Sequence, residues 1–373
     1  MKRILYVRSG PYQINLDSYN SQEIGLATAF AERNVRCDVL YYHKKKNFDQ
    51  VVKKNGHEIK ILWRKGVRVL RSGIYPQILN RSFLSGYDAI FVSEYSQIMS
   101  VLLSRLHANV YVYNGPYYNL FKLPLCERLY DFFFVKLLNR NVKHFFCKTQ
   151  MAMEYLQKKG LQNCSVVGVG LDVEKFNGSV PLDSNTKILL SKMEGFRTIL
   201  YVGSISKRKN IAFLLKVFNQ LKMDSAFSNV KFILIGEDCD GYIRICKDVI
   251  NPEFADSVVF FGGVKNDQLG YVYKKADVFV LASLQEIFGM VLLESMYFGT
   301  PVIASASAGA KTLIENGESG LIIEGFETND WVLAFKRVLL SQESDMGNNA
   351  KKRIENYFTW TSIVEKMSAE MNV

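Results

Sequence analysis

Short runs of β-branched and aromatic residues alternate with amphipathic stretches along the whole chain. This alternation predicts parallel sheets whose strands are connected through helices, an α/β fold. The predicted strands cover residues 3–9, 37–43, 88–94, 109–114, 145–149 and 165–169 in the first half, and residues 198–203, 231–236, 257–262, 277–282, 301–305 and 320–324 in the second. The clearest predicted helices cover residues 22–33, 151–159, 210–221, 289–298 and 329–340.

The pattern is interrupted by a polar stretch over residues 173–197, which contains Asn177-Gly178-Ser179 and Pro181. We interpret it as a linker between an N-terminal Rossmann-like domain, residues 1–172, and a C-terminal one, residues 198–373, with the option that the last helix crosses back to the first domain. A length of 373 residues agrees with two domains, since one domain usually has ~150. Two doubly wound domains predict a central cleft where strand ends face a ligand.

The composition excludes several classes of protein. With 48% apolar and 22% charged residues, the chain is neither disordered nor fibrous. No apolar run approaches the ~18 residues of a membrane span, and the first apolar run ends at Arg8, too soon for a signal peptide. Six cysteines and four histidines are scattered without metal or disulfide spacing. A cytoplasmic protein is therefore expected.

Charge differs strongly between the two halves. Residues 1–180 hold 26 Lys and Arg against 13 Asp and Glu, whereas residues 181–373 hold 21 against 23. The densest stretch begins at Lys44 and ends at Arg71, with ten basic residues against Asp49 and Glu58, and Trp63 among them. It predicts peripheral contact with an anionic membrane surface. Residues 120–148 mix aromatic and basic side chains, which suits either a buried helix with a basic outer side or a second membrane segment.

The strongest chemical signal follows the predicted strand 277–282. A loop-to-helix junction there, with Phe288, Gly289, Met290 and Val291, aims backbone N–H groups at an anion such as phosphate. Glu286 in the loop and Glu294 in the helix suit hydroxyl groups, which donate to carboxylates. A phosphate that carries polyols on both sides is a nucleotide-sugar. The alternative is that both glutamates are solvated surface residues.

These residues resemble retaining glycosyltransferases of the GT-B fold, specifically glycosyltransferase family 4. The E-x7-E motif of the family corresponds to Glu286 and Glu294, with Phe-Gly after the first Glu and a Gly-x-Pro-Val segment at residues 299–302. The resemblance implies that Glu286 contacts hydroxyls of the donor sugar and that Glu294 contacts the ribose.

A second segment runs from Gly203 to Lys209 after the strand 198–203. It resembles the loop of this family in which an Arg and a Lys hold the diphosphate. Lys209 stands at the Lys position, and Ser204 stands where the family has Arg. We expect Arg208 or Lys207 to supply the missing charge.

The first half departs further from the family. The polar segment Ser18-Tyr19-Asn20-Ser21-Gln22-Glu23 stands in place of a Gly-Gly loop, and Asn114 stands near the position of a His beside the donor sugar. Asn114 can hydrogen-bond a hydroxyl but cannot titrate. Asp172, His107 and His144 are interpreted as structural residues. In the second half, residues 308–312 replace a Gly-Gly pair followed by an acidic residue.

The resemblance implies transfer from a UDP- or GDP-sugar to a glycan or lipid-linked acceptor, in cell-envelope polysaccharide or glycolipid synthesis at the inner face of the plasma membrane. The leaving diphosphate would accept the proton of the acceptor, while Glu286, Lys209 and Asn114 act at the transferring sugar, without metal or cofactor.

Four alternatives differ in chemistry. A sugar-nucleotide epimerase or a phosphorylase uses a similar cleft. A dinucleotide oxidoreductase lacks support, since no Gly-x-Gly-x-x-Gly follows the first strand. A basic nucleic-acid-binding protein lacks a recognisable motif, so no nucleic acid partner is expected.

Overall fold

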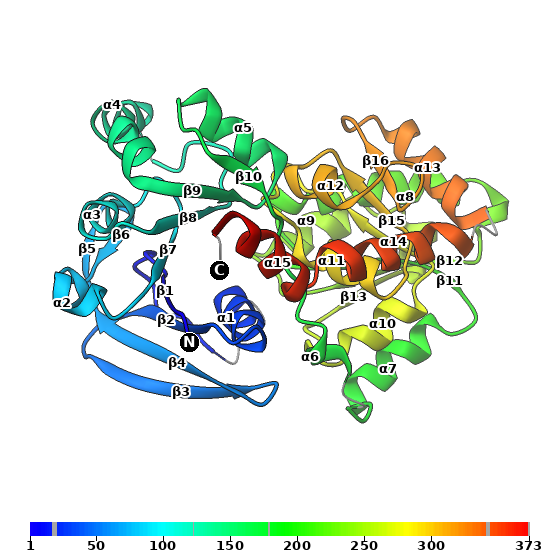
Figure 1. The fold of residues 1–373 in the computed structure, drawn as a ribbon. Coiled ribbons are helices and arrows are strands. Elements are labelled where there is room, and N and C mark those ends of the chain that lie inside the picture. Colours follow the sequence, from blue (N-terminus) through cyan, green and yellow to red (C-terminus); the bar gives the residue numbers. More distant parts are fainter. Residues whose placement is uncertain (17–20, 122, 178–179, 341–343, 372–373) are drawn as a thin grey trace. The chain divides into compact units, whose positions relative to one another are not determined.

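The computed structural model describes residues 1–16, 21–121, 123–177, 180–340 and 344–371. The chain forms two compact units, one made of Met1–Asp172 with Thr359–Val373, the other of Val173–Phe358. The stretch expected as a linker contains α6 (Glu174–Asn177) and α7 (Ser184–Met193), which belong to the second unit. Gly178 and Ser179 of that stretch lie outside the described residues. The last helix, α15 (Trp360–Met371), belongs to the first unit (Figure 1).

The first unit contains an eight-stranded sheet in the order β10-β9-β8-β7-β1-β2-β4-β3. All neighbouring strands are parallel except β3, which pairs antiparallel with β4. The strands are β1 (Arg3–Val7), β2 (Arg36–His43), β3 (Phe48–Lys54), β4 (His57–Lys65), β7 (Ala89–Ser93), β8 (Val110–Asn114), β9 (Val142–Cys147) and β10 (Cys164–Val166); a separate hairpin is formed by β5 (Val67–Val69) and β6 (Ser72–Ile74).

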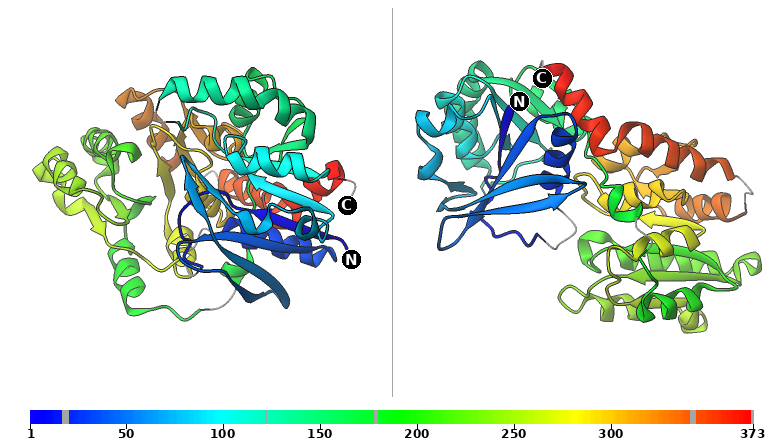
Figure 2. Two further views of the ribbon diagram at one scale, coloured as in Figure 1. Left: turned by 90° about the vertical axis from the view of Figure 1, so that its left-hand side faces the viewer. Right: turned by 60° about the horizontal axis from the view of Figure 1, so that its bottom comes forward.

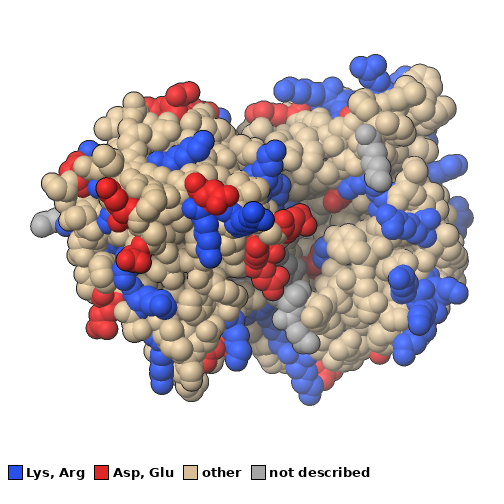
Figure 3. Space-filling model, turned by 180° about the vertical axis from the view of Figure 1, so that it is seen from behind, with Lys and Arg blue, Asp and Glu red and all other residues tan. Residues whose placement is uncertain are grey.

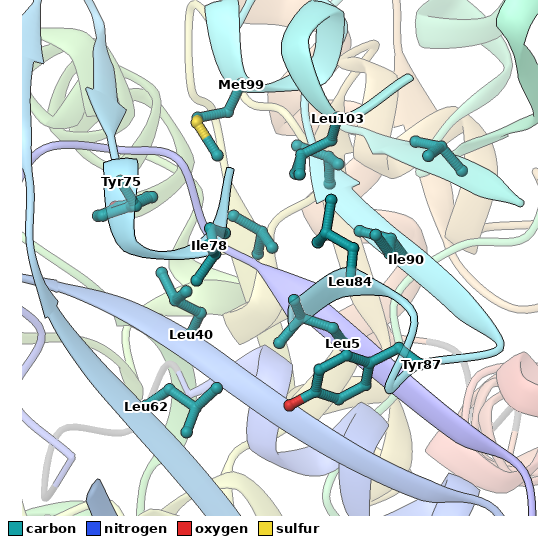
Figure 4. Packing of buried hydrophobic residues seen from close by; sticks show 13 residues of the cluster. Leu5, Leu40, Leu62, Tyr75, Ile78, Leu84, Tyr87, Ile90, Met99 and Leu103 are labelled. Carbon is teal, nitrogen blue, oxygen red and sulfur yellow. The ribbon is translucent and has the colours of Figure 1, made fainter. Parts of the chain in front are cut away.

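Helices cover both faces of this sheet (Figure 2). They are α1 (Gln22–Glu32), α2 (Arg81–Leu84), α3 (Ile98–Leu106), α4 (Pro124–Asn141), α5 (Gln150–Lys158) and α15. One face carries a core of aliphatic and aromatic side chains under α2 and α3, including Leu5, Leu40, Ile90, Met99 and Leu103 (Figure 4). Burial of this apolar surface is the main favourable contribution to the stability of the unit.

The helices α1 and α15 pack against each other through a small residue. A Cβ atom at Gly25 would lie 2.2 Å from the indole nitrogen of Trp360, so only glycine lets the two helices approach this closely. The end of the chain is thereby built into the first unit.

The second unit contains a six-stranded, fully parallel sheet in the order β13-β12-β11-β14-β15-β16. Its strands are β11 (Arg197–Val202), β12 (Val230–Ile235), β13 (Val258–Phe261), β14 (Val278–Leu281), β15 (Val302–Ser305) and β16 (Leu321–Ile323). Its further helices are α8 (Ile211–Lys222), α9 (Tyr242–Val249), α10 (Leu269–Lys275), α11 (Met290–Tyr297), α12 (Ala308–Leu313), α13 (Thr328–Leu340) and α14 (Ser344–Tyr357).

The alternating pattern predicts these elements well. Each of the twelve predicted strands is present with ends shifted by three residues or fewer, and the five predicted helices are present as α1, α5, α8, α11 and α13. The strands β3 to β6 were not predicted. They lie in and around the basic stretch between Lys44 and Arg71.

That basic stretch is less suited to a membrane than its composition suggests. Trp63 is only 4% exposed and donates a hydrogen bond to Gln50, so the expected contact of its ring with lipid headgroups is wrong. Five of the ten cations lie in ion pairs: Lys53, Lys54, Lys60, Arg64 and Arg71. Figure 3 shows how Lys, Arg, Asp and Glu are distributed over one face of the molecule.

Among the described helices, none combines the length and apolar character that a membrane span requires.

Candidate functional site

The strand order of the second unit defines where a ligand is expected. The strands that follow β11 lie on one side of it up to β13, and the chain then crosses to the other side with β14 (Figure 1). In open parallel sheets, ligands bind at the carboxyl ends of the strands, at this kind of switch point. The segment from Gly203 to Asn210 follows β11, and the segment from Ala282 to Gly289 follows β14.

Hydrogen bonds join the two segments. The backbone N–H of Leu284 donates to the carbonyl of Arg208 over 3.0 Å, and Arg208 Nη1 donates to the carbonyl of Gln285 over 2.8 Å. The hydroxyl of Ser305, at the end of β15, donates to the carbonyl of Ser283 over 2.8 Å. The side chains on these segments are therefore held at fixed positions relative to one another.

The structure brings Lys209 and Glu286 together. Lys209 Nζ lies 2.5 Å from Glu286 Oε2, and both side chains are mostly buried. Arg208 Nη1 lies 3.6 Å from the same oxygen, and its side chain is half exposed. Of the two residues expected to replace the missing Arg, Arg208 is thus the one beside Glu286, whereas Lys207 is exposed. Ser204 contributes its carbonyl, which accepts a hydrogen bond from Tyr201.

The loop-to-helix junction has the geometry that the sequence predicts. Gly289 has a φ of +79°, a left-handed conformation that glycine adopts without strain, and α11 begins at the next residue. The N–H groups of Leu292 and Leu293 donate to the carbonyl of Gly289. Those of Met290 and Val291 precede the first helical hydrogen bonds, so they have no acceptor within the helix and can face an anion.

The loop before α11 is held by a close approach of α12. A Cβ atom at Gly309 would lie 1.8 Å from the carbonyl oxygen of Phe288, which is itself buried. Sequence reasoning treated residues 308–312 only as a departure from the family. The small residues Ala308, Gly309 and Ala310 were the available signal for a close approach at this position.

Glu294 lies inside the second unit. It is 1% exposed, and Tyr273 donates its phenolic hydrogen to Glu294 Oε2 over 3.1 Å. Burial, followed by the charge of Glu294, raises the pKa of Tyr273 well above its usual range, so this phenol remains a donor. The carboxylate therefore has a structural hydrogen bond, and its contact with a ribose stays a prediction.

Asn114 does not offer its side chain to a ligand. The residue is fully buried, its Oδ1 accepts from the backbone N–H of Tyr95, and its Nδ2 donates to the carbonyl of Pro116. Both ends of the amide are used within the first unit, where they hold the turn after β8. The structure therefore does not support the expected hydrogen bond from Asn114 to a sugar hydroxyl.

The first unit has a charged cluster at its own switch point, between β1 and β7, which sequence reasoning missed. Arg8, directly after β1, lies 3.0 Å from Glu23, whose carboxylate also accepts from Tyr41. Lys148, directly after β9, donates to Gln22 over 2.9 Å. The pKa of Lys148 is lowered, mainly by desolvation. The charge of Glu23 opposes this shift, and the charge of Arg8 adds to it. Arg8 and Lys148 lie near the carboxyl ends of the predicted strands 3–9 and 145–149, and that position was the available signal.

The segment expected to replace the Gly-Gly loop falls partly in this cluster. Ser18, Tyr19 and Asn20 lie outside the described residues. Ser21 precedes α1, and the next two residues are its first two.

Known proteins resemble part of the chain in sequence and the whole chain in fold. Residues 187–353, which include Lys209 and both glutamates, match the model of the family Glycosyl transferases group 1. An uncharacterized glycosyltransferase of Methanocaldococcus jannaschii is 29% identical over 58% of this chain and 61% of its own length. The alpha-monoglucosyldiacylglycerol synthase of Streptococcus pneumoniae is 33% identical over 43% of this chain and 36% of its own length. The chain thus spans less than two thirds of either relative.

Solved structures resemble the whole chain. Anabaena HepE in complex with UDP has a TM-score of 0.75 at 17% identity and covers 100% of both chains. Sucrose-phosphate synthase from Thermosynechococcus elongatus has a TM-score of 0.72 at 19% identity and covers 99% of this chain and 98% of its own. The fold is therefore that of the GT-B glycosyltransferases, with two Rossmann-like units. The match to the group 1 glycosyltransferase family, residues 187–353, lies within the second unit.

Proposed function

We propose that this protein is a retaining glycosyltransferase that moves a sugar from a nucleotide-sugar to an acceptor. The observation that carries the proposal is the pairing of Lys209 with Glu286 at the β11–β14 switch point, inside the region that matches the family model. In a sugar nucleotide, an oxygen of the second phosphate is bonded directly to the sugar. A cation and a carboxylate 2.5 Å apart fit this junction, with Lys209 on phosphate and Glu286 on a hydroxyl.

The nucleoside diphosphate is expected to lie against the start of α11. The N–H groups of Met290 and Val291 and the positive end of the helix dipole favour phosphate oxygens there. Arg208, beside Glu286, adds a second cation. HepE, a structural neighbour, was solved with UDP, which supports UDP as the first donor nucleotide to test.

The acceptor is proposed to bind the first unit. Arg8 and Lys148 place two cations near Glu23, and the charge of Glu94 also acts on Lys148. This mixed cluster suits an acceptor with hydroxyl and anionic groups. One relative is named as a synthase of a glycosylated diacylglycerol, which supports a glycolipid or other lipid-linked acceptor of the cell envelope.

The proposed chemistry uses the leaving diphosphate as the base. Glu286 is engaged by Lys209, and Glu294 by Tyr273, so neither carboxylate is proposed as a nucleophile. The diphosphate takes the proton of the acceptor hydroxyl on the face from which it departs, which retains the anomeric configuration. Lys209, Arg208 and the helix start stabilise the charge that develops on the departing phosphate.

Two measurements test the proposal. A thermal-shift panel of UDP, GDP, ADP and NAD identifies the nucleotide, since a ligand that binds only the folded state raises its stability. Proton NMR of the product then gives its anomeric configuration, for which we expect an α-glycoside from an α-linked donor. A β-glycoside would contradict retention, and stabilisation by NAD alone would indicate an oxidoreductase. Conversion of the donor into an epimeric nucleotide-sugar without any acceptor would indicate an epimerase.

A further inference from the structure

The outward side of α4 is apolar at its N-terminal end. Leu125, Leu129, Phe132 and Phe133 are between 50% and 77% exposed, although the sequence left open that this helix is buried. Buried contacts of the helix come instead from Tyr130, Val135 and Leu138. Four large apolar side chains exposed on one helix are more than scattered surface residues, and such patches usually mark an interaction site.

The two acidic residues of α4 are turned inward. Glu127 and Asp131 lie 2.9 Å and 2.5 Å from the ammonium group of Lys159, which directly follows α5. Tyr95 and Tyr155 also donate hydrogen bonds to these carboxylates. Both carboxylates are therefore turned toward one shared cation within the unit and away from the outer side of the helix.

The cations of α4 are turned outward. Arg128, Lys136 and Arg140 are exposed, and at 100° per residue they fall within the same arc of the helix as the four apolar side chains. We call this set of seven residues the α4 outer face: Leu125, Arg128, Leu129, Phe132, Phe133, Lys136 and Arg140. It has three positive charges and no negative one. Lys143 is exposed just beyond the end of the helix.

We propose that the α4 outer face docks on an anionic lipid bilayer. An exposed helix face that combines aromatic and aliphatic side chains with Lys and Arg alone is suited to lie in the headgroup layer, where its apolar side chains reach the acyl chains and its cations meet anionic headgroups. A second copy of the chain is disfavoured as the occupant, because two such faces would bring cations against cations. The inference does not depend on the proposed transfer, although a lipid-linked acceptor would agree with it.

Charge and apolar contact make separable contributions. The full chain is sedimented with vesicles of phosphatidylcholine alone and with vesicles of equal parts phosphatidylcholine and phosphatidylglycerol. We expect binding to the anionic vesicles only, weakened by added salt. The triple variant Arg128→Glu, Lys136→Glu, Arg140→Glu should bind at least tenfold more weakly, and the double variant Phe132→Ser, Phe133→Ser should also lose at least tenfold with the charge unchanged.

A matched control carries the same change of charge elsewhere in the first unit. Lys44→Glu, Lys45→Glu, Lys46→Glu reverses three exposed cations of the basic stretch, and we expect at most a twofold effect. Equal losses in the two triple variants would overturn the assignment to α4, since they would indicate attraction by overall charge. Unchanged binding of the Phe132→Ser, Phe133→Ser variant would overturn it as well.

Insertion can be observed directly. The three tryptophans, Trp63, Trp331 and Trp360, are all buried, so a Phe132→Trp variant adds an exposed reporter. We expect its emission to shift to the blue with anionic vesicles and to be quenched by brominated lipid. An unchanged emission, or a blue shift that follows protein concentration in the absence of vesicles, would overturn the proposal and, in the second case, indicate self-association. UDP binding is measured for every variant. If it is unchanged, a loss of vesicle binding reports on the α4 outer face and not on the proposed donor site.

Discussion

Lys209 and Glu286 share one short contact, so each substitution changes the surroundings of the other residue. Lys209→Ala removes the cation placed at the diphosphate. We expect UDP to bind about ten- to a hundredfold more weakly, while uridine, which has no phosphate, changes little. Isothermal titration with both ligands measures this, with Lys207→Ala as the matched control at an exposed neighbour. Equal losses of affinity for UDP and uridine would contradict the assignment of Lys209 to the diphosphate.

Glu286→Ala is expected to act on turnover rather than on nucleotide affinity. Removing one preorganised group from the transferring sugar lowers kcat by about 10²–10³-fold in comparable sites. The affinity for UDP should remain or rise, because Lys209 loses its carboxylate partner and becomes free to hold phosphate. Steady-state kinetics together with UDP titration measure both quantities. A wild-type kcat would refute the role assigned to Glu286.

Glu294 can be tested for its two roles separately. Glu294→Ala removes the acceptor of the Tyr273 hydroxyl and leaves a buried phenol without its partner, which costs about 1–3 kcal/mol of unfolding free energy. Glu294→Gln keeps an oxygen at that position and should retain most of the stability. If Glu294→Ala, measured below its melting transition, still binds the donor with wild-type affinity, the ribose contact is ruled out.

At the residue scale, sequence reasoning predicts where a residue lies when the motif around it is local. Glu286 and Gly289 lie within one loop, and the position of Lys209 follows from a strand and a turn. It failed for Asn114, because the exposure of that side chain is set by the turn at Pro116 and by the backbone of Tyr95, on a different strand connection. Burial of this kind depends on tertiary contacts that no local pattern contains.

At the scale of elements, the contact between α12 and the loop before α11 has a testable consequence. Gly309→Ala places a methyl group where the carbonyl of Phe288 lies, so the loop or the helix must move. We expect weaker UDP binding by about tenfold or more, because backbone N–H groups act on phosphate only when well aligned. Gly262→Ala, whose Cβ would meet no atom within 4 Å, is the matched control and should leave binding unchanged.

The hairpin of β3 and β4 illustrates a missed element whose signal was present. Asn55 and Gly56 both have positive φ, 49° and 75°, which is the backbone of a tight two-residue hairpin turn. The Asn-Gly pair lies between two runs rich in valine and isoleucine, but the many lysines there favoured interpretation as a charged surface. The hairpin is anchored by the buried Ile59, Ile61 and Leu62 of β4, which pairs with β2. Its cations pair with Asp49 and Glu58.

At the scale of the whole molecule, the return of the chain to its first unit makes α15 important for that unit alone. Trp360→Ala removes a buried indole that packs on Gly25, which costs about 3–5 kcal/mol by comparison with other large-to-small core changes. We expect a lower melting transition for the first unit and an unchanged affinity for UDP in the second. Trp331→Ala, in the core of the second unit, is the matched control. It should lower the melting transition of the second unit and leave that of the first unit unchanged. Parallel losses in both transitions would contradict independent units.

Sequence reasoning located the division of the chain near residue 172 but left the position of the last helix open. The amphipathic pattern of residues 360–371 indicates a helix with one apolar side, and it does not indicate which sheet that side covers. The contacts of Trp360 with Gly25 and Gly170 decide this. Gly25 lies over 300 residues before Trp360, so a local sequence pattern cannot indicate their contact.

The discontinuity of the first unit bears on how the protein is made. A ribosome releases residues 1–172 long before residues 359–373, because Val173–Phe358 must be translated in between. At about 5–20 residues per second, that interval lasts roughly 10–40 s. During this time, the surface of α1 around Gly25 faces solvent or a chaperone instead of Trp360, and the last residue of the second unit is translated before α15 begins. The half of the protein that leaves the ribosome first is thus the half that is completed last.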